Sequence, residues 1–331
     1  MVGRGTLLVV LAVLGAVTLA GCKVVSPPTT AVPIRAAFYY PWFPEAWAQQ
    51  GQNPFTSYTP ARGSYASDVA TVRAHIADMQ YGGITVGLAS WFGRASSTER
   101  HWPAMMEAAQ GTGFGWAPYY EPEGIGDPTP QQIADDLHYL WSTYRSGDSG
   151  LLYLSGKGMA VFVYNADDAT QADGCDTASR WSQARQLLSS QYGERIYIDL
   201  KVFPGYRTCP DTPAVDGWHQ YGPASANQDF STAPGDGSYS ISPGYWKSGS
   251  AYGTAPFLAR DRARWQASIA GMRASSAVWE LITTYNEWGE GSAVESATGC
   301  RSAAPAGTYC DWSGGGTGSE PIADLHAVPP G

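Results

Sequence analysis

The chain has 331 residues, of which 15% are charged and 44% hydrophobic, and its net charge at pH 7 is −9. This composition suits a large globular domain with a sizeable core and argues against coiled coil and highly charged disorder. No Lys/Arg-rich run appears, so a nucleic-acid partner is not expected.

The N-terminus has the pattern of an export signal. Arg4 precedes an apolar run over 7–19 that is short for a membrane span. The stretch Leu19-Ala20-Gly21-Cys22 resembles the bacterial lipobox, which implies cleavage after residue 21 and lipidation of Cys22. Residues 1–21 are therefore predicted to be a signal peptide, and 22–33, with three prolines, a flexible tether. A bacterial lipoprotein on the outer face of the cell membrane follows, attached through its lipid alone; a plain secretory signal is the alternative.

Strand-type apolar runs then alternate with amphipathic segments along the chain. Eight strands are predicted, at 34–42, 84–93, 114–124, 157–168, 195–203, 214–225, 238–246 and 277–288. Helices are predicted within 68–83, 97–113, 129–145, 178–193 and 256–275. Ser67 and Thr129 are the expected N-caps of the first and third helices. No convincing helical pattern separates the fifth strand from the seventh.

This alternation predicts an α/β fold, a single-domain (β/α)₈ TIM barrel over residues 34–299. A doubly wound open sheet is the alternative, but no G-x-G-x-x-G or P-loop follows any predicted strand. Residues 300–331 are rich in Gly and Ser and are expected to form a tail that wraps the barrel loosely.

The ends of the predicted strands carry the candidate site, because barrel enzymes place their active sites at the carboxyl ends of the strands. Acids at these ends are surrounded by aromatic, amide and imidazole side chains, which suit a carbohydrate cleft. The candidates for substrate binding from these ends are Tyr40, Trp91, Glu121, Tyr164, His219, Tyr221, Tyr245 and Asn286.

The last strand runs into "ITTYNEWGEGSAVESA", residues 282–297, which gathers three carboxylates. Glu287 and Glu290 are close enough in sequence to serve one site, and glycoside hydrolysis usually needs two carboxyl groups. We expect these two to be catalytic and Glu295 to be structural.

The cysteines predict disulfides. Without Cys22, four remain in an exported chain, which allows three pairings of two bonds. Cys300–Cys310 is the more local pair, and Cys175–Cys209 would then join two neighbouring loops. No C-x-x-C, H-E-x-x-H or G-x-S-x-G motif appears, so neither a metal nor a cofactor is predicted, and a serine hydrolase is not expected.

The strand-end motifs "AFYYPWF", "GITVGLASWFG", "YYEPEG", "KGMAVFVYN" and "ITTYNEWGEGSAVESA" resemble, in order, those of family-99 glycoside hydrolases. That family contains endo-α-mannosidases and endo-α-1,2-mannanases on a (β/α)₈ barrel. Its Glu-Trp-x-Glu motif matches Glu287-Trp288-Gly289-Glu290. The resemblance implies retaining hydrolysis through a 1,2-anhydro sugar, with Glu287 as base for the sugar 2-hydroxyl and Glu290 as general acid/base. It also implies that Glu121, and the aromatic Tyr40, Trp91, Tyr164 and Tyr221, line the site.

Two departures from the family leave the sugar and linkage open. Gly289 stands where characterised mannosidases often have His, and residues 292–297 read S-A-V-E-S-A in place of a common T-Q-I-E-P-A. The expected partner is a polysaccharide or glycan. A non-catalytic glycan-binding lipoprotein and a glycosidase for another polysaccharide are the alternatives.

Overall fold

The computed structural model describes Met1 and residues 33–48, 55–56, 58–121, 126–145, 150–164, 170–247, 258–300 and 318–330. Apart from Met1, the predicted signal peptide lies outside the described residues, as do Cys22, most of the tether and Cys310, and the statements about them remain predictions.

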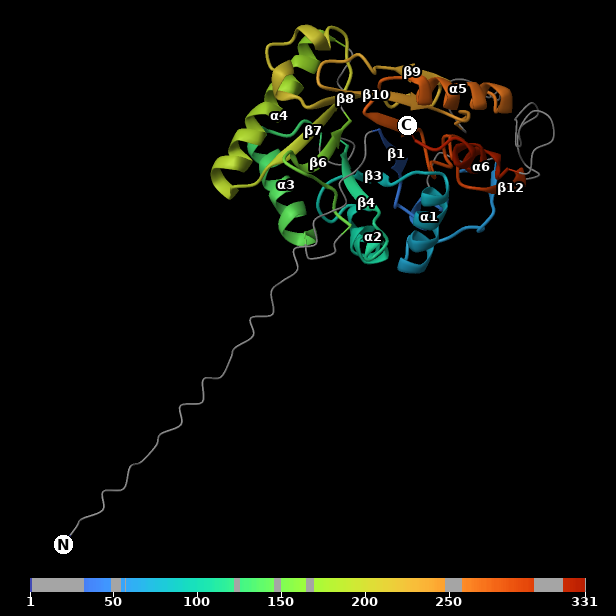
Figure 1. Cartoon of the computed structure of the whole chain (residues 1–331), viewed down its shortest axis with the longest axis horizontal. Helices are drawn as coiled ribbons and strands as arrows, with labels where there is room; N and C mark the ends of the chain where they lie inside the picture. The colour runs from blue at the N-terminus through green and yellow to red at the C-terminus, as the bar shows by residue number, and fades with distance from the viewer. Residues whose placement is uncertain are drawn as a thin grey trace.

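Eight parallel strands close into a barrel (Figure 1). In order around it they are β1 (Ile34–Tyr39), β3 (Val86–Trp91), β4 (Gly115–Tyr120), β6 (Gly158–Val163), β7 (Ile196–Lys201), β8 (Gly217–His219), β10 (Asp236–Ile241) and β11 (Trp279–Ile282). Because β11 pairs in parallel with both β10 and β1, the sheet has no open edge. The predicted (β/α)₈ barrel is confirmed, and each strand overlaps one predicted run.

Short antiparallel strands decorate this barrel. β5 (Tyr153–Leu154) pairs with β6, and β9 (Asn227–Asp229) pairs with β10. A separate two-stranded sheet joins β2 (Tyr58–Pro60) to β12 (Ala297–Cys300). It joins the segment after β1 to the segment after β11, so the carboxyl ends of these two strands are held next to each other.

Helices surround the barrel: α1 (Val69–Tyr81), α2 (Trp102–Ala109), α3 (Pro130–Tyr144), α4 (Gln171–Tyr192) and α5 (Arg262–Ala274). Thr129 caps α3 as predicted, within a capping box completed by Gln132. The N-cap of α1 is Asp68 and not Ser67, because the Asp68 carboxylate accepts the N–H of Thr71. Short 3₁₀ turns are η1 (Glu45–Ala48), η2 (Glu99–His101), η4 (Tyr206–Thr208) and η5 (Thr212–Ala214).

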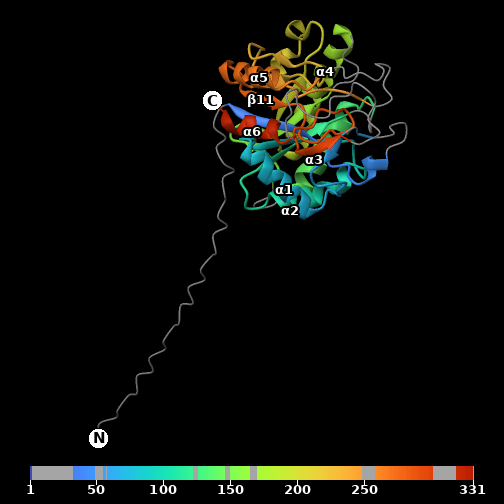
Figure 2. The ribbon, with the colours of Figure 1, turned by 90° about the vertical axis from the view of Figure 1, so that its right-hand side faces the viewer.

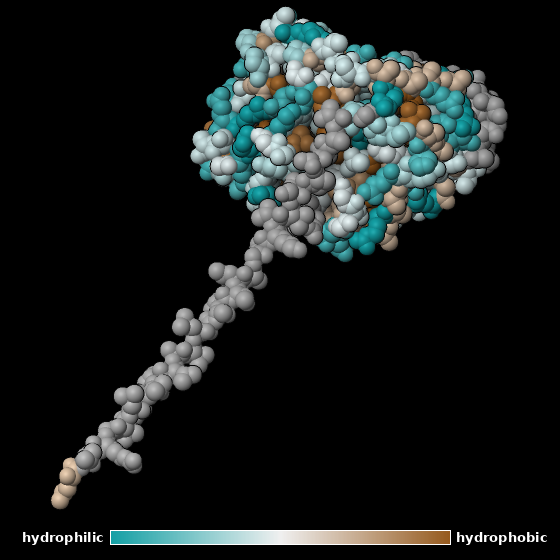
Figure 3. Space-filling view, in the orientation of Figure 1, coloured by the Kyte–Doolittle hydropathy of each residue, from teal (hydrophilic) through white to brown (hydrophobic). Residues whose placement is uncertain are grey.

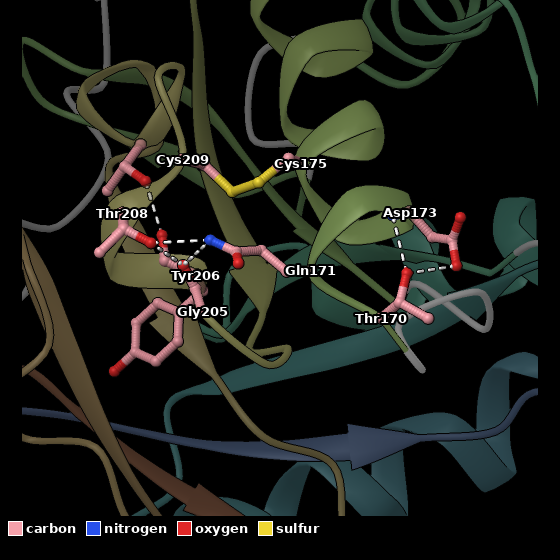
Figure 4. Close-up of a disulfide and its surroundings, with 9 residues drawn as sticks. Thr170, Gln171, Asp173, Cys175, Gly205, Tyr206, Thr208 and Cys209 are labelled. Carbon is pink, nitrogen blue, oxygen red and sulfur yellow. Dashed lines mark hydrogen bonds between the residues drawn. A yellow bond between two sulfur atoms is a disulfide. The ribbon is translucent and has the colours of Figure 1, made fainter.

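Residues 202–235, all described, contain no α-helix, as the sequence predicted. A disulfide between Cys175 on α4 and Cys209 after η4 holds this region against the barrel (Figure 4). Gln171, also on α4, donates from Nε2 to the Thr208 hydroxyl at 2.8 Å. The predicted Cys175–Cys209 pair is therefore present, although Cys175 lies in a helix and not in a loop; Cys300–Cys310 lies outside what can be described.

The end of the tail packs closely instead of wrapping loosely. Helix α6 (Glu320–Ala327) lies between α5 and α1 in both views (Figures 1 and 2) and contacts both helices. Its Ile322 and Leu325 are buried, and the Leu325 carbonyl accepts a hydrogen bond from Arg35 on β1. The sequence did not predict this helix, because it has only two apolar turns after a Gly/Ser-rich stretch.

The core has two layers. Ala36, Phe38 and Tyr40 belong to the layer inside the barrel, whereas Ala37 and Tyr39 pack between the barrel and the helices. This alternation along each strand decides which strand-end side chains can reach the mouth of the barrel. Figure 3 shows that the visible surface is mostly hydrophilic, with apolar colour in small areas. Among the described residues, no helix is long and apolar enough to cross a membrane.

Candidate active site

The chain makes a tight turn after β11 that carries the predicted acids; residues 284–294 are called the acidic turn below. The Thr284 backbone pairs with Ser292 and Val294 across its base. The Thr284 hydroxyl accepts the N–H of Glu287 at 2.8 Å. Gly291 adopts a φ of 66°, which favours glycine, and an added Cβ would lie 3.0 Å from the Trp246 carbonyl oxygen.

Glu287 and Glu290 lie together in this turn. Glu287 is 3% exposed, and its Oε1 accepts the backbone N–H of Glu290 at 3.2 Å. The Tyr221 hydroxyl at the end of β8 donates to Glu290 Oε2 at 2.6 Å, and Lys247 Nζ lies 3.6 Å from Glu290 Oε1. The segments that follow β8, β10 and β11 thus converge on one pair of carboxyl groups.

The environment of Glu287 favours the protonated form of its carboxyl group. Burial, followed by the neighbouring charge of Glu290, raises the pKa of Glu287 well above its usual range. Lys247 and the backbone N–H groups of Gly289 and Glu290 act in the opposite direction without reversing the shift. Two interacting carboxyl groups of this kind lose their protons in separate steps, so one acid and one base coexist over a range of pH.

Phenols and a third acid adjoin the pair. The pKa of Tyr40 is raised by burial, then by the charges of Glu121, Glu290 and Glu287 among others. The pKa of Tyr221 is raised by burial and by Glu290, Tyr40 and Glu287. Both phenols therefore stay protonated as hydrogen-bond donors. Glu121, 5% exposed at the end of β4, belongs to the same cluster.

A cleft of about 450 Å³ opens beside this cluster, at the ends of β7 and β8. Tyr221 links the two, because it lines the cleft and also donates to Glu290. Lys201 is a second lining residue, and its Nζ lies 4.3 Å from the centre of the Tyr164 ring. The cleft is lined by Lys201, Val202, Phe203, Pro204, Tyr206, Gln220, Tyr221, Gln228 and Phe230.

Asn286 and Tyr245 serve the framework of the site. The Asn286 amide is fully buried and bonds the Tyr40 backbone at both ends, accepting its N–H at 2.8 Å and donating to its carbonyl at 2.9 Å. It therefore fixes the end of β1 to the acidic turn. Tyr245 is half-buried, and its backbone pairs with Leu258 by two hydrogen bonds of 2.9 and 3.0 Å.

Trp91 and His219 are fully buried and do not reach the surface. Trp91 faces outward from β3 and packs against Tyr120, which gives it a packing role in place of the predicted sugar contact. His219 packs inside the barrel, with Nδ1 2.8 Å from Asp199 Oδ1. Burial, then the Lys201 charge, lowers the pKa of His219 to about 3, so the ring is neutral.

Sequence reasoning missed three contributors to the acidic turn. Lys247 directly follows the seventh predicted strand, which was a signal that could have been used. Thr284 lies within the quoted motif, but its capping role requires the turn geometry. Arg260 is buried and donates to the carbonyls of Gly291 and Ala293, and nothing in the sequence marks it.

Among the described residues, no group of three or more His, Cys, Asp or Glu side chains could hold a metal ion. The carboxyl groups of the cluster can transfer protons, and its carboxyl and phenol groups can both form hydrogen bonds.

No protein-family model and no curated protein matches the sequence. Solved structures do match. A GH99 endo-α-mannosidase from Bacteroides thetaiotaomicron superposes with a TM-score of 0.71 at 18% identity, over 90% of this chain and 97% of that one. The same enzyme in complex with bis-tris-propane gives 0.70 at 20% identity, with the same coverage. This chain shares their fold. At this level of identity the likeness establishes the barrel, and the activity is argued from the site.

Proposed function

We propose that this chain is a glycoside hydrolase that cleaves α-mannoside-type linkages within a glycan, with retention of anomeric configuration. The observation that carries the proposal is the contact between the buried Glu287 and the partly buried Glu290 after the carboxyl end of β11. The shared fold with GH99 endo-α-mannosidases and the Glu-Trp-x-Glu motif support it.

In the first step, the Glu287 carboxylate takes the proton of the sugar 2-hydroxyl. The 2-oxygen attacks its own anomeric carbon, the bond from that carbon to the glycosidic oxygen breaks, and Glu290 protonates the departing oxygen. The product is a 1,2-anhydro sugar. In the second step, water attacks the anomeric carbon while Glu290 takes a proton from it. The bond between the anomeric carbon and the 2-oxygen breaks, and Glu287 returns its proton to the 2-oxygen. The configuration of the anomeric carbon is inverted in each step, so the product keeps the configuration of the substrate.

The raised pKa of Glu287 suits its role, because a more basic carboxylate accepts a hydroxyl proton with a larger driving force. The proposed reaction requires an ionised Glu287 and a protonated Glu290 when substrate is bound. The hydrogen bond from the Tyr221 hydroxyl holds the Glu290 carboxyl group in position near Glu287. Tyr40 and Glu121 line the same site and supply polar groups for sugar hydroxyls.

The test is to incubate the protein with α-mannans of different linkage and to identify products by mass. Oligosaccharides released from internal positions support the proposal. Binding of glycan with no new reducing ends would instead indicate a glycan-binding protein.

We further propose that the protein is exported and anchored by lipid at Cys22. The Cys175–Cys209 disulfide supports export, because such bonds persist in oxidising compartments. A Cys22→Ala variant should move from the membrane fraction to the medium or to the soluble fraction. Retention of that variant in the membrane would refute anchoring at this residue.

A further inference from the structure

A buried polar cluster lies behind the acidic turn and is not used by the proton transfers above. Trp288 stands between Glu287 and Glu290 in the chain and is fully buried. Its indole N–H lies 3.1 Å from both Glu295 Oε2 and the Tyr65 hydroxyl. The Tyr65 hydroxyl in turn donates to Glu295 Oε2 at 2.7 Å. One carboxylate oxygen thus accepts two donors, and one of them belongs to the residue between the predicted catalytic acids.

The other oxygen of Glu295 faces α1 and the segment that precedes this helix. His75 Nε2 on α1 lies 3.2 Å from Oε1, and Arg62 Nη1 lies 3.6 Å from it. The other nitrogen of His75 lies 3.0 Å from the Tyr39 hydroxyl on β1. Glu295 is therefore attached to an outer helix and, through His75, to the first barrel strand.

Glu295 is held as an anion. It is 1% exposed, and burial alone would raise its pKa, but His75, Tyr65 and Arg62 together hold that pKa below its usual range. A buried charge is costly unless it is fully hydrogen-bonded, and apolar packing would hold the Trp288 ring without it. What the anion adds is a fixed direction for the indole N–H.

That direction matters because Trp288 shares its two peptide bonds with Glu287 and Gly289, and Glu290 follows. A displacement of the indole that shifts the Trp288 backbone would move both carboxyl groups. Displacements of about 1 Å in a catalytic group can cost about 10²-fold in rate.

We propose that Glu295, acting through Tyr65 and Trp288, sets the placement of Glu287 and Glu290 relative to one another and to the sugar. Glu295 is a positioning residue, and this inference rests on the proposed function.

Three variants test it: Glu295→Gln removes the charge, Tyr65→Phe removes the hydroxyl, and Trp288→Phe removes the indole N–H while keeping an aromatic ring. The matched control is Glu99→Gln, since Glu99 is also a buried carboxylate that accepts tyrosine hydroxyls, from Tyr139 and Tyr144. Each variant is compared at equal folded fraction, measured by circular dichroism.

We expect each of the three variants to lower kcat by about 10- to 100-fold with little change in KM, and to shift the pH profile of kcat. Glu99→Gln should leave kcat and its pH profile unchanged. If Glu295 is purely structural, the three variants should have the kcat and pH profile of the wild type once the folded fraction is matched. Alternatively, Glu99→Gln should lose as much kcat as they do. Either result would overturn the inference.

A second readout does not need activity. The pKa of Glu287 can be followed by carboxyl carbon NMR in the free protein. Trp288→Phe changes no charge, but it should shift this pKa because the distance between the Glu287 and Glu290 carboxyl groups changes. An unmoved titration refutes the placement role even in a protein that cleaves no glycan. Absence of glycan cleavage by the wild type, by contrast, refutes the proposed function alone.

Discussion

Glu287 and Glu295 lie in the same stretch of the chain and are both buried, but their surroundings shift their pKa values in opposite directions. Burial and a neighbouring carboxylate raise the pKa of Glu287. Around Glu295 a histidine, a tyrosine hydroxyl and an arginine outweigh burial and lower the pKa. The comparison teaches that burial does not assign a role to an acid. A carboxyl group whose ionised form is disfavoured is suited to exchange a proton. One whose ionised form is stabilised by neighbouring donors and cations is suited to hold those neighbours in place.

The largest effect is expected from Glu290→Gln. It removes the acid that protonates the leaving oxygen, so kcat on natural glycans should fall by about 10²- to 10⁴-fold. It also removes the charge that raises the pKa of Glu287, which should then titrate closer to an ordinary glutamate. Steady-state kinetics and carboxyl NMR check the two parts. A Glu287 titration unchanged in this variant would show that the two groups do not interact.

Glu295→Gln should lower the free energy of unfolding by about 2–4 kcal/mol at pH 7, because a buried, hydrogen-bonded anion is lost. The folded-state pKa of Glu295 is depressed, so its contribution is present above the unfolded pKa and disappears as pH falls through the folded pKa. The stability gap between variant and wild type should therefore narrow on acidification. Urea titrations at several pH values measure it, and a constant gap would contradict the account.

Tyr221→Phe should lower kcat by about tenfold. It removes the hydrogen bond to Glu290, and once Glu290 has given up its proton such a bond to a charged group is worth about 1.5 kcal/mol. Tyr144→Phe is the control, because Tyr144 donates to a buried carboxylate outside the site. If both variants keep full activity, the Tyr221–Glu290 bond has no part in the reaction.

Glu287→Gln should act on stability in the opposite direction to Glu295→Gln. Because the folded-state pKa of Glu287 is raised, its ionisation costs stability as pH rises through that pKa. The variant should gain about 1 kcal/mol over the wild type at neutral to alkaline pH, as active-site substitutions often do. Thermal unfolding across pH tests this, and a loss of stability there would remove the contrast between the two acids.

The smallest effect is expected from Arg62→Met. Arg62 is partly exposed and lies 2.8 Å from Asp78 and 3.6 Å from Glu295, so each ion pair should contribute about 0.5 kcal/mol or less. High salt should reduce even that difference. A loss as large as that of Glu295→Gln would mean that Arg62, and not His75 and Tyr65, holds the anion.

The barrel was predictable because parallel strands covered on both faces leave continuous apolar runs in the sequence. For the same reason, the sequence could not predict whether each strand side chain points into the barrel or toward the helices. Trp91 and Tyr40 both end apolar runs, yet one faces the helices and the other the interior. With both faces apolar, no alternation distinguishes them.

The acids were found because the last strand delivers Glu287 and Glu290 within a few residues of its end. Tyr221 was predicted to line the site, but its hydrogen bond to Glu290 was not. Lys247 and Arg260 were not predicted either, because all three residues reach the acidic turn only when the sheet closes. The dual bond of Asn286 to the Tyr40 backbone likewise depends on β1 and β11 becoming neighbours.

The most direct test of the central claim is a time-resolved proton NMR assay of the first product released from an α-mannan, with wild type and Glu287→Gln side by side. The account predicts that the wild type first releases the α-anomer, with the β-anomer appearing only by mutarotation, and that the folded variant releases no product. A first product of β configuration, or undiminished release by Glu287→Gln, would contradict it.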